Sequence, residues 1–91
     1  MKYDTYVFVE DPSHAWLAVT IKELIELGIA DKISCYSYVK GNIAYLEEDC
    51  DANLFIKAYK EKYAEVPKWE KVSVENTPIR NYQHYDYKEV A

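Results

Sequence analysis

Glycine and arginine are both scarce in this sequence. Of its 91 residues only 2 are glycine, Gly28 and Gly41, and only Arg80 is arginine. Two isolated glycines cannot form the glycine-rich loop that cradles phosphates or dinucleotides. Nucleic-acid binding relies on clustered lysine and arginine, whereas this chain has 16 acidic residues against 11 basic ones and a net charge of −5. The composition therefore argues against direct binding to nucleic acid.

Cysteine and histidine are equally sparse, with 2 residues of each. Cys35 and Cys50 are too few for a disulfide-stapled fold, and nothing near them has the Cys-x-x-Cys or histidine spacing of a zinc site. We therefore expect two free thiols and neither a bound metal nor a cofactor.

Long apolar runs are missing too. No stretch approaches the roughly 18 residues that span a bilayer, and the first residues lack the basic start and apolar core of a signal peptide. With 49% hydrophobic and 30% charged residues, the chain is expected to fold as one domain, residues 1–91, in the cytoplasm and without membrane contact.

The first half of the chain predicts two strands and a helix. Residues 3–9 are β-branched and aromatic, which favours a strand, and after the turn at 11–13 the apolar residues 15–19 predict a strand returning antiparallel. Thr20 and Glu23 have the spacing of a capping box, which predicts a helix over residues 21–27. Gly28 is expected to end this helix in a left-handed conformation.

The second half predicts a hairpin, a longer helix and a final strand. Residues 35–39 and 43–47 alternate around a tight turn at Gly41-Asn42, which places Tyr38 opposite Tyr45. A helix over residues 52–64 is expected, capped by Asp49 or Asp51. Residues 69–74 predict a fifth strand that is exposed or at an edge of the sheet.

These elements predict an α+β domain in the order ββαββαβ. Its two helices are expected to pack on one face of a mainly antiparallel sheet. Residues 76–91 lack a clear period and are interpreted as a less ordered tail.

The residues that could carry chemistry do not form a recognisable catalytic motif. The acidic run at 47–51 could coordinate a hard cation, but it lacks the spaced ligands of an EF-hand and is better explained as a connector and helix cap. Ser13, His14 and the two cysteines are nucleophile and base types, yet no Gly-x-Ser-x-Gly elbow is present. We expect a protein that is not an enzyme.

Ten tyrosines are the clearest anomaly of the composition. Tyrosine joins a large apolar ring to a polar tip and is enriched where proteins bind proteins. A small core cannot absorb them all, so the tyrosines of the tail either form an exposed binding or self-association surface or dock onto the sheet of the same chain.

Three segments carry a resemblance to known sequences. They are SHxWLxV at residues 13–19, LGIxDKISxYSY at 27–38 and YLEEDCDA at 45–52. The chain resembles a group of small proteins encoded by bacteriophages, plasmids and related mobile elements, over most of residues 7–82. The resemblance implies an accessory protein of a mobile element, acting inside a bacterial host cell. It implies no particular reaction.

The leading hypothesis is a non-enzymatic accessory protein that binds a host or defence protein, for example as a stoichiometric inhibitor of CRISPR or restriction nucleases. Its binding surface is expected to combine the acidic run with exposed aromatic side chains, namely Glu47, Glu48, Asp49, Trp69, Tyr82 and Tyr85. The alternatives are a small metal-dependent enzyme using the acidic run with His14, and a structural or self-assembling protein that pairs through a strand edge as a homodimer or larger assembly.

Overall fold

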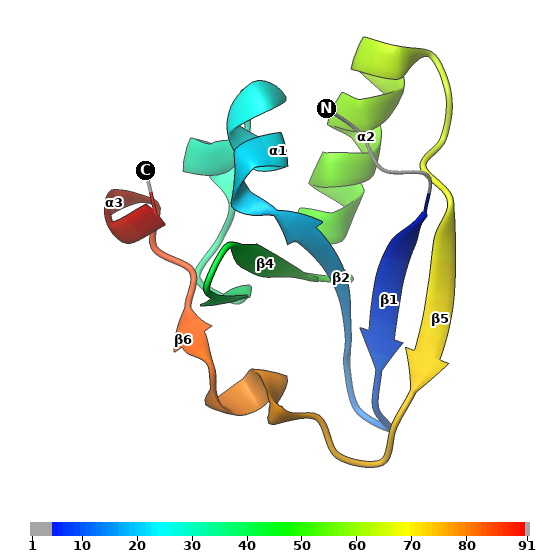
Figure 1. Ribbon diagram of the computed structural model, residues 1–91, viewed down its shortest axis with the longest axis vertical. Helices are drawn as coiled ribbons and strands as arrows, with labels where there is room; N and C mark the ends of the chain where they lie inside the picture. Colours follow the sequence, from blue (N-terminus) through cyan, green and yellow to red (C-terminus); the bar gives the residue numbers. More distant parts are fainter. Residues whose placement is uncertain (1–4, 91) are drawn as a thin grey trace.

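The computed structural model describes residues 5–90, so the first two residues of the predicted opening strand lie outside the described part of the chain. The six strands form a single sheet in the order β5-β1-β2-β4-β3-β6. Their bounds are β1 Tyr6–Glu10, β2 Ala15–Thr20, β3 Tyr38–Lys40, β4 Ile43–Glu47, β5 Trp69–Ser73 and β6 Gln83–His84. The helices are α1 Ile21–Glu26, α2 Asp51–Tyr63 and α3 Tyr87–Val90, with 3-10 turns at Ala30–Lys32 and Pro78–Asn81. The predicted α+β class is confirmed (Figure 1).

The β1–β2 hairpin and the start of α1 follow from local hydrogen bonds. Asp11 Oδ1 accepts the N–H groups of Ser13 and His14, which closes the turn between two antiparallel strands. The predicted capping box is present, because Thr20 Oγ1 accepts the Glu23 N–H while a Glu23 carboxylate oxygen accepts the Thr20 N–H. Gly28 has the left-handed φ of 73° that ends the helix.

The second hairpin has the predicted register. Tyr38 lies opposite Tyr45 and Val39 opposite Ala44, with Gly41 at a φ of 60° in the turn. The first strand of this hairpin is shorter than the predicted 35–39, however, since β3 begins only at Tyr38. The preceding residue, Ser37, is fully buried, and its hydroxyl bonds to Asp51 of α2. The residues before Tyr38 therefore do not pair with β4.

The predicted cap of α2 is wrong. The helix begins at Asp51 and its N-cap residue, Cys50, makes no capping hydrogen bond through its side chain. Asp51 instead accepts hydrogen bonds from the connector before β3. Its carboxylate takes the Ser34 N–H at 3.1 Å, the Ser34 hydroxyl at 2.7 Å and the Ser37 hydroxyl at 2.5 Å. The aspartate is buried because these three donors replace water.

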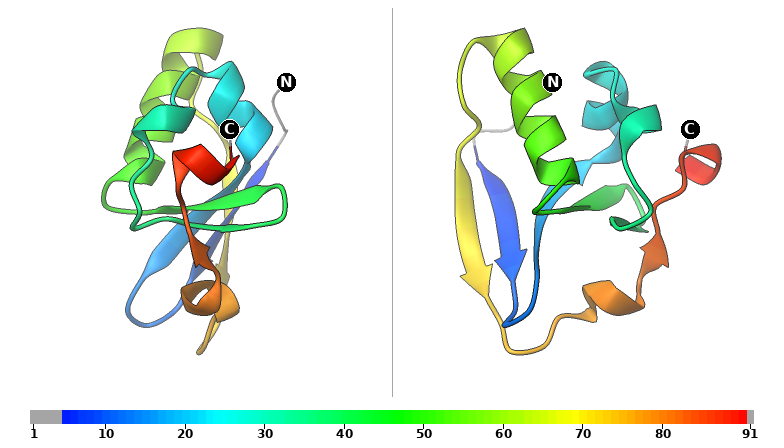
Figure 2. Two further views of the ribbon diagram at one scale, coloured as in Figure 1. Left: turned by 90° about the vertical axis from the view of Figure 1, so that its left-hand side faces the viewer. Right: turned by 180° about the vertical axis from the view of Figure 1, so that it is seen from behind.

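The helices α1 and α2 cover one face of the sheet, as predicted. When the molecule is viewed from behind, α2 lies in front of the strands (Figure 2). Between the two layers lie Tyr6, Leu17 and Leu46 of the strands, together with Leu24 of α1 and Phe55 of α2. Tyr6 also donates its hydroxyl to Glu23 Oε2 at 2.5 Å, which ties β1 to the capping box of α1.

The edge strand β5 pairs parallel to β1, whereas the other pairs in the sheet are antiparallel. The sheet is therefore mainly antiparallel, as expected. The parallel pair requires a crossover, and α2 supplies it by running back across the sheet.

The tail folds onto the body of the protein. It adds β6 to the outer side of β3, with His84 opposite Tyr38. Tyr85 is 2% exposed, and its hydroxyl donates to the Ala30 carbonyl at 2.5 Å. Within residues 5–90, no helix has the length and apolarity needed to cross a membrane.

Replacing Asp51 with alanine should lower the free energy of unfolding by about 3 kcal/mol, because three donors in a buried site lose their acceptor. Asp49→Ala is the matched control, since Asp49 belongs to the same acidic run but is exposed. Its change should stay within about 0.5 kcal/mol. Urea unfolding measures both values, and equal stabilities for the two variants would contradict this account of the connector.

Candidate functional site

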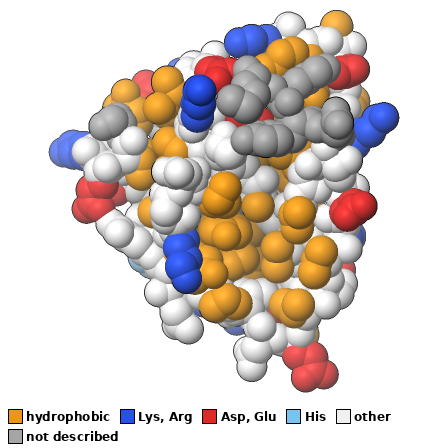
Figure 3. Space-filling model, in the orientation of Figure 1, with side chains coloured by type: hydrophobic (Ala, Val, Ile, Leu, Met, Phe, Trp, Pro, Cys, Tyr) orange, Lys and Arg blue, Asp and Glu red, His pale blue; other side chains and the backbone are white. Residues whose placement is uncertain are grey.

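The face of the sheet opposite α1 and α2 carries large side chains in cross-strand rows. One row runs from Val72 through Val9 and Trp16 to Glu47, and the next includes Val7. Viewed from this side, apolar side chains form a patch that charged groups border (Figure 3). Val7 is 42% and Val72 43% exposed, so the part over β1 and β5 is open to solvent.

At the other end of these rows lies a shallow pocket of about 350 Å³, which we call the acidic aromatic pocket. It is lined by His14, Trp16, Tyr36, Tyr38, Glu47, Asp49, Arg80 and His84. The pocket therefore joins the predicted acidic run to several aromatic rings, from segments that are far apart in the sequence.

Trp16 forms the inner wall of the acidic aromatic pocket and is only 2% exposed. The Arg80 guanidinium lies 5.8 Å from the centre of its ring and pairs with Asp11 Oδ1 at 2.8 Å. Burial works to raise the pKa of Asp11, but the N–H groups of His14 and Ser13 and the Arg80 charge outweigh it and hold the pKa below its usual value. The arginine is thus held over the tryptophan by an ionised partner.

The rim of the acidic aromatic pocket is more open. Tyr36 is 72% exposed. Tyr38 packs against the His84 ring at a centroid distance of 4.7 Å, and His84 Nδ1 lies 2.7 Å from the Cys35 carbonyl oxygen. Glu47 Oε2 accepts the Asp49 N–H at 2.7 Å, which fixes the turn that follows β4 and keeps both acids at the pocket.

The predicted binding residues do not form one surface. Glu47 and Asp49 line the acidic aromatic pocket, and Glu48 is exposed beside them but is not part of its lining. Trp69 is on the opposite face of the sheet, 6.1 Å from the Phe8 ring.

Two tail tyrosines were also predicted to be exposed. Tyr82 is half-buried against the Tyr45 ring, with the Lys40 ammonium 4.8 Å from its centre. Tyr85 lies in the core, so its assignment to a binding surface was wrong. Its hydroxyl bonds to the 3-10 turn at Ala30–Lys32, and its ring is part of the core cluster that includes Ile29 and Ile33.

Sequence reasoning paired His14 with the acidic run only for the metal-dependent alternative, and it did not place Tyr36 or Tyr38 beside these acids. The predicted hairpin register already placed Tyr38 opposite Tyr45. What could not be predicted was that β2 pairs with β4, which sets Trp16 opposite Glu47.

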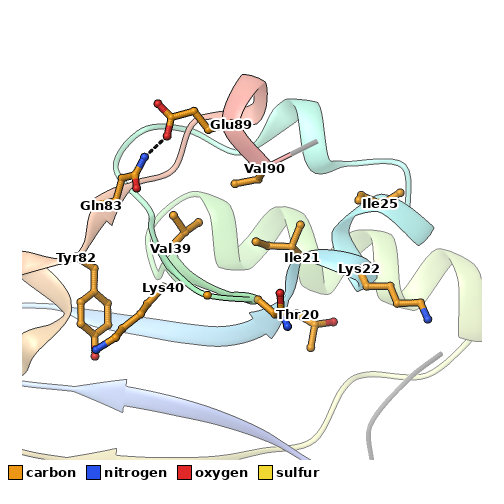
Figure 4. A pocket seen from close by; sticks show the side chains of 12 residues that line it. Thr20, Ile21, Lys22, Ile25, Val39, Lys40, Tyr82, Gln83, Glu89 and Val90 are labelled. Atoms are coloured by element: carbon orange, nitrogen blue, oxygen red, sulfur yellow. Dashed lines mark hydrogen bonds between the residues drawn. The ribbon is translucent and has the colours of Figure 1, made fainter.

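A groove of about 950 Å³ lies between α1, the β3–β4 turn and the tail. Its wall is apolar, with Ile21, Ile25, Val39 and Val90, and Lys22 and Lys40 stand at its edge (Figure 4). On one side the groove is lined by the tail, within which Gln83 donates a hydrogen bond to Glu89. The tail therefore forms a wall of this groove.

The ionisable groups of the described residues offer neither a metal cluster nor an activated thiol. Within residues 5–90 no three His, Cys, Asp or Glu side chains are grouped so that they could hold a metal ion. Both cysteines are free thiols, as predicted, and both are exposed. The Asp51 charge, with burial and Glu47, raises the pKa of the Cys50 thiol, which disfavours the reactive thiolate.

No protein-family model matches this chain, and no curated protein or solved structure is significantly similar to it.

Replacing Tyr85 with phenylalanine tests the docking of the tail. Burial raises the pKa of Tyr85 to about 12, above its usual value of 10, so the folded state retains a proton that the unfolded state loses between these two pH values. The hydroxyl should stabilise the protein by about 1 kcal/mol at pH 7, and this advantage over Tyr85→Phe should shrink as the pH rises above 10.

Urea unfolding at neutral and alkaline pH measures this difference. Tyr36→Phe is the control, since its side chain is exposed, and it should change stability little at either pH. A stability difference for Tyr85→Phe that does not depend on pH would contradict a buried, protonated hydroxyl.

Proposed function

We propose that this protein acts by binding another protein through the acidic aromatic pocket. The observation that carries the proposal is that Glu47, Asp49 and Tyr36 line the same pocket, while the Tyr36 side chain is 72% exposed. A large aromatic side chain that a protein leaves in water, beside a hollow with fixed walls, is typical of a contact surface.

The chemistry of the pocket favours a basic side chain of the partner. Carboxylates form charge-assisted hydrogen bonds with lysine or arginine, and the faces of Tyr36 and Tyr38 attract the same cations. Arg80 already occupies the face of Trp16, so an incoming cation would contact the rim rather than the inner wall. The net charge of −5 would favour association with a basic partner.

The proposed partner is a bacterial host or defence protein. The resemblance to small proteins of phages and mobile elements supports this choice, because such proteins often act by stoichiometric binding. A basic groove of a CRISPR or restriction nuclease has the charge that the acidic aromatic pocket would bind. Occupation of that groove would inhibit the nuclease without any turnover by this protein.

Binding should be lost when the rim of the pocket is changed. We expect the wild-type protein, immobilised as bait, to retain a partner from a bacterial lysate in near-stoichiometric amount, and Tyr36→Ser and Asp49→Lys each to weaken retention at least tenfold. The partner identified in this way is then titrated against the purified variants by calorimetry.

Two variants serve as matched controls for this experiment. Tyr87→Ser removes an exposed tyrosine from α3, and Glu61→Lys reverses an exposed acid on α2, both outside the pocket lining. Both should bind like the wild type. Equal loss in the controls, or full binding by both pocket variants, would overturn the proposal.

A second candidate is a small metal-dependent hydrolase, because the acidic aromatic pocket also brings His14 to the same hollow as Glu47 and Asp49. It has weaker support, since Glu47 is engaged by the Asp49 N–H and no cluster suited to a metal is found among the described residues. Hydrolysis that depends on added Mn²⁺ and disappears in His14→Ala would favour this candidate over protein binding.

A further inference from the structure

The outer edge of β5 has backbone groups that pair with no described residue. The Tyr6 N–H donates to the Lys68 carbonyl and the Val74 N–H donates to the Glu10 carbonyl, both at 2.9 Å. In a parallel pair these bonds alternate along the strand, so Glu70 and Val72 face β1. The N–H and C=O groups of Trp69, Lys71 and Ser73 therefore point away from it.

Nothing described in the chain covers this edge. All five residues of β5 are exposed, and two views show β5 at the border of the molecule with no described segment beyond it (Figures 1 and 2). The opposite end of the sheet is different, because β6 has only two residues. An uncovered strand of this length is a template for pairing with another chain.

We propose that two copies of this chain pair through β5, antiparallel and about a two-fold axis, and so join their sheets into one. The proposal does not depend on the acidic aromatic pocket, which is separated from β5 by β1 and is lined by residues of β2, β3 and β4. We choose a second copy of this chain as the partner because β5 can pair antiparallel with the β5 of that copy in one register without placing like charges opposite each other.

The charges of β5 select that register. A two-fold axis through Glu70 would set two glutamates face to face, and an axis through Lys71 would do the same with two lysines; both arrangements are unfavourable. An axis through Trp69 or through Ser73 would depend on residues beyond the ends of β5. An axis through Val72 sets the two valines in contact.

In the register centred on Val72, each Lys71 lies opposite the Ser73 of the other copy. These are the residues whose backbone groups point outward, so the two pairs would form four hydrogen bonds. Val72 is 43% exposed on the open face and Val74 is 38% exposed. The valine contact would bury part of this surface and join the apolar patches of the two copies.

Sedimentation velocity over a wide concentration range tests the dimer. We expect the wild type to form a dimer as its concentration rises. Lys71→Pro should be monomeric, because proline removes an outward N–H without breaking a bond to β1. Lys71→Ala is the matched control: it loses the same side chain but keeps the N–H, and it should dimerise. A wild type that stays monomeric, or a Lys71→Pro variant that still dimerises, would overturn the proposal.

Disulfide crosslinking tests the register in a protein that is otherwise unchanged at β5. In a Cys35→Ser, Cys50→Ser background, Val72→Cys should crosslink two chains under mild oxidation, because the two side chains lie opposite each other. Lys71→Cys should crosslink at least tenfold more slowly, because it faces a serine. Faster crosslinking through Lys71→Cys, or none through Val72→Cys, would overturn the pairing proposed here, even if Lys71→Pro fails to fold.

Discussion

The buried carboxylate of Asp51 joins four parts of the chain that would otherwise be independent. It accepts hydrogen bonds from Ser34 and Ser37 in the connector before β3. Ser37 in turn accepts the Glu47 N–H at the end of β4, and its carbonyl accepts the Tyr85 N–H of the tail. The start of α2, the connector, β4 and the tail are thus positioned by one group of polar atoms centred on the buried Asp51 and Ser37. Such a network is specific because each member leaves a neighbour unsatisfied if it moves.

The position of the acidic aromatic pocket follows from this network. Glu47, the last residue of β4, donates its own N–H to Ser37, and Tyr36 directly precedes Ser37, so both residues lie at or next to the hydrogen bonds that fix the backbone. Glu47 and Asp49 are held at the end of β4 by the hydrogen bond between them. His84 lies in the tail directly before Tyr85, which is buried. The exposed side chains of the pocket therefore stand on a backbone that buried hydrogen bonds hold in place, which lowers the entropy cost of binding.

The two faces of the sheet have different roles for a simple geometric reason. Two helices can cover one face of a sheet of this size, and the 13-residue α2 must also return the chain to the far edge for parallel pairing. The other described segments cover only part of the second face. They shield Trp16 and leave Val7 and Val72 in solvent, which separates a polar, aromatic end of that face from an apolar end.

The sequence alone determined the features that depend on hydrogen bonds between near neighbours: the capping box at Thr20, the turn after Asp11, the left-handed Gly28 and the register of Tyr38 with Tyr45. It also indicated that the acids after β4 would lie beside aromatic rings, but not which rings. The tertiary structure decided the order of the strands, the parallel pairing of β5, the burial of Tyr85 and the use of Asp51 as an acceptor for the connector. These features join residues 14 to 63 positions apart, and such contacts are selected by the packing of the whole core and not by the preferences of any short segment.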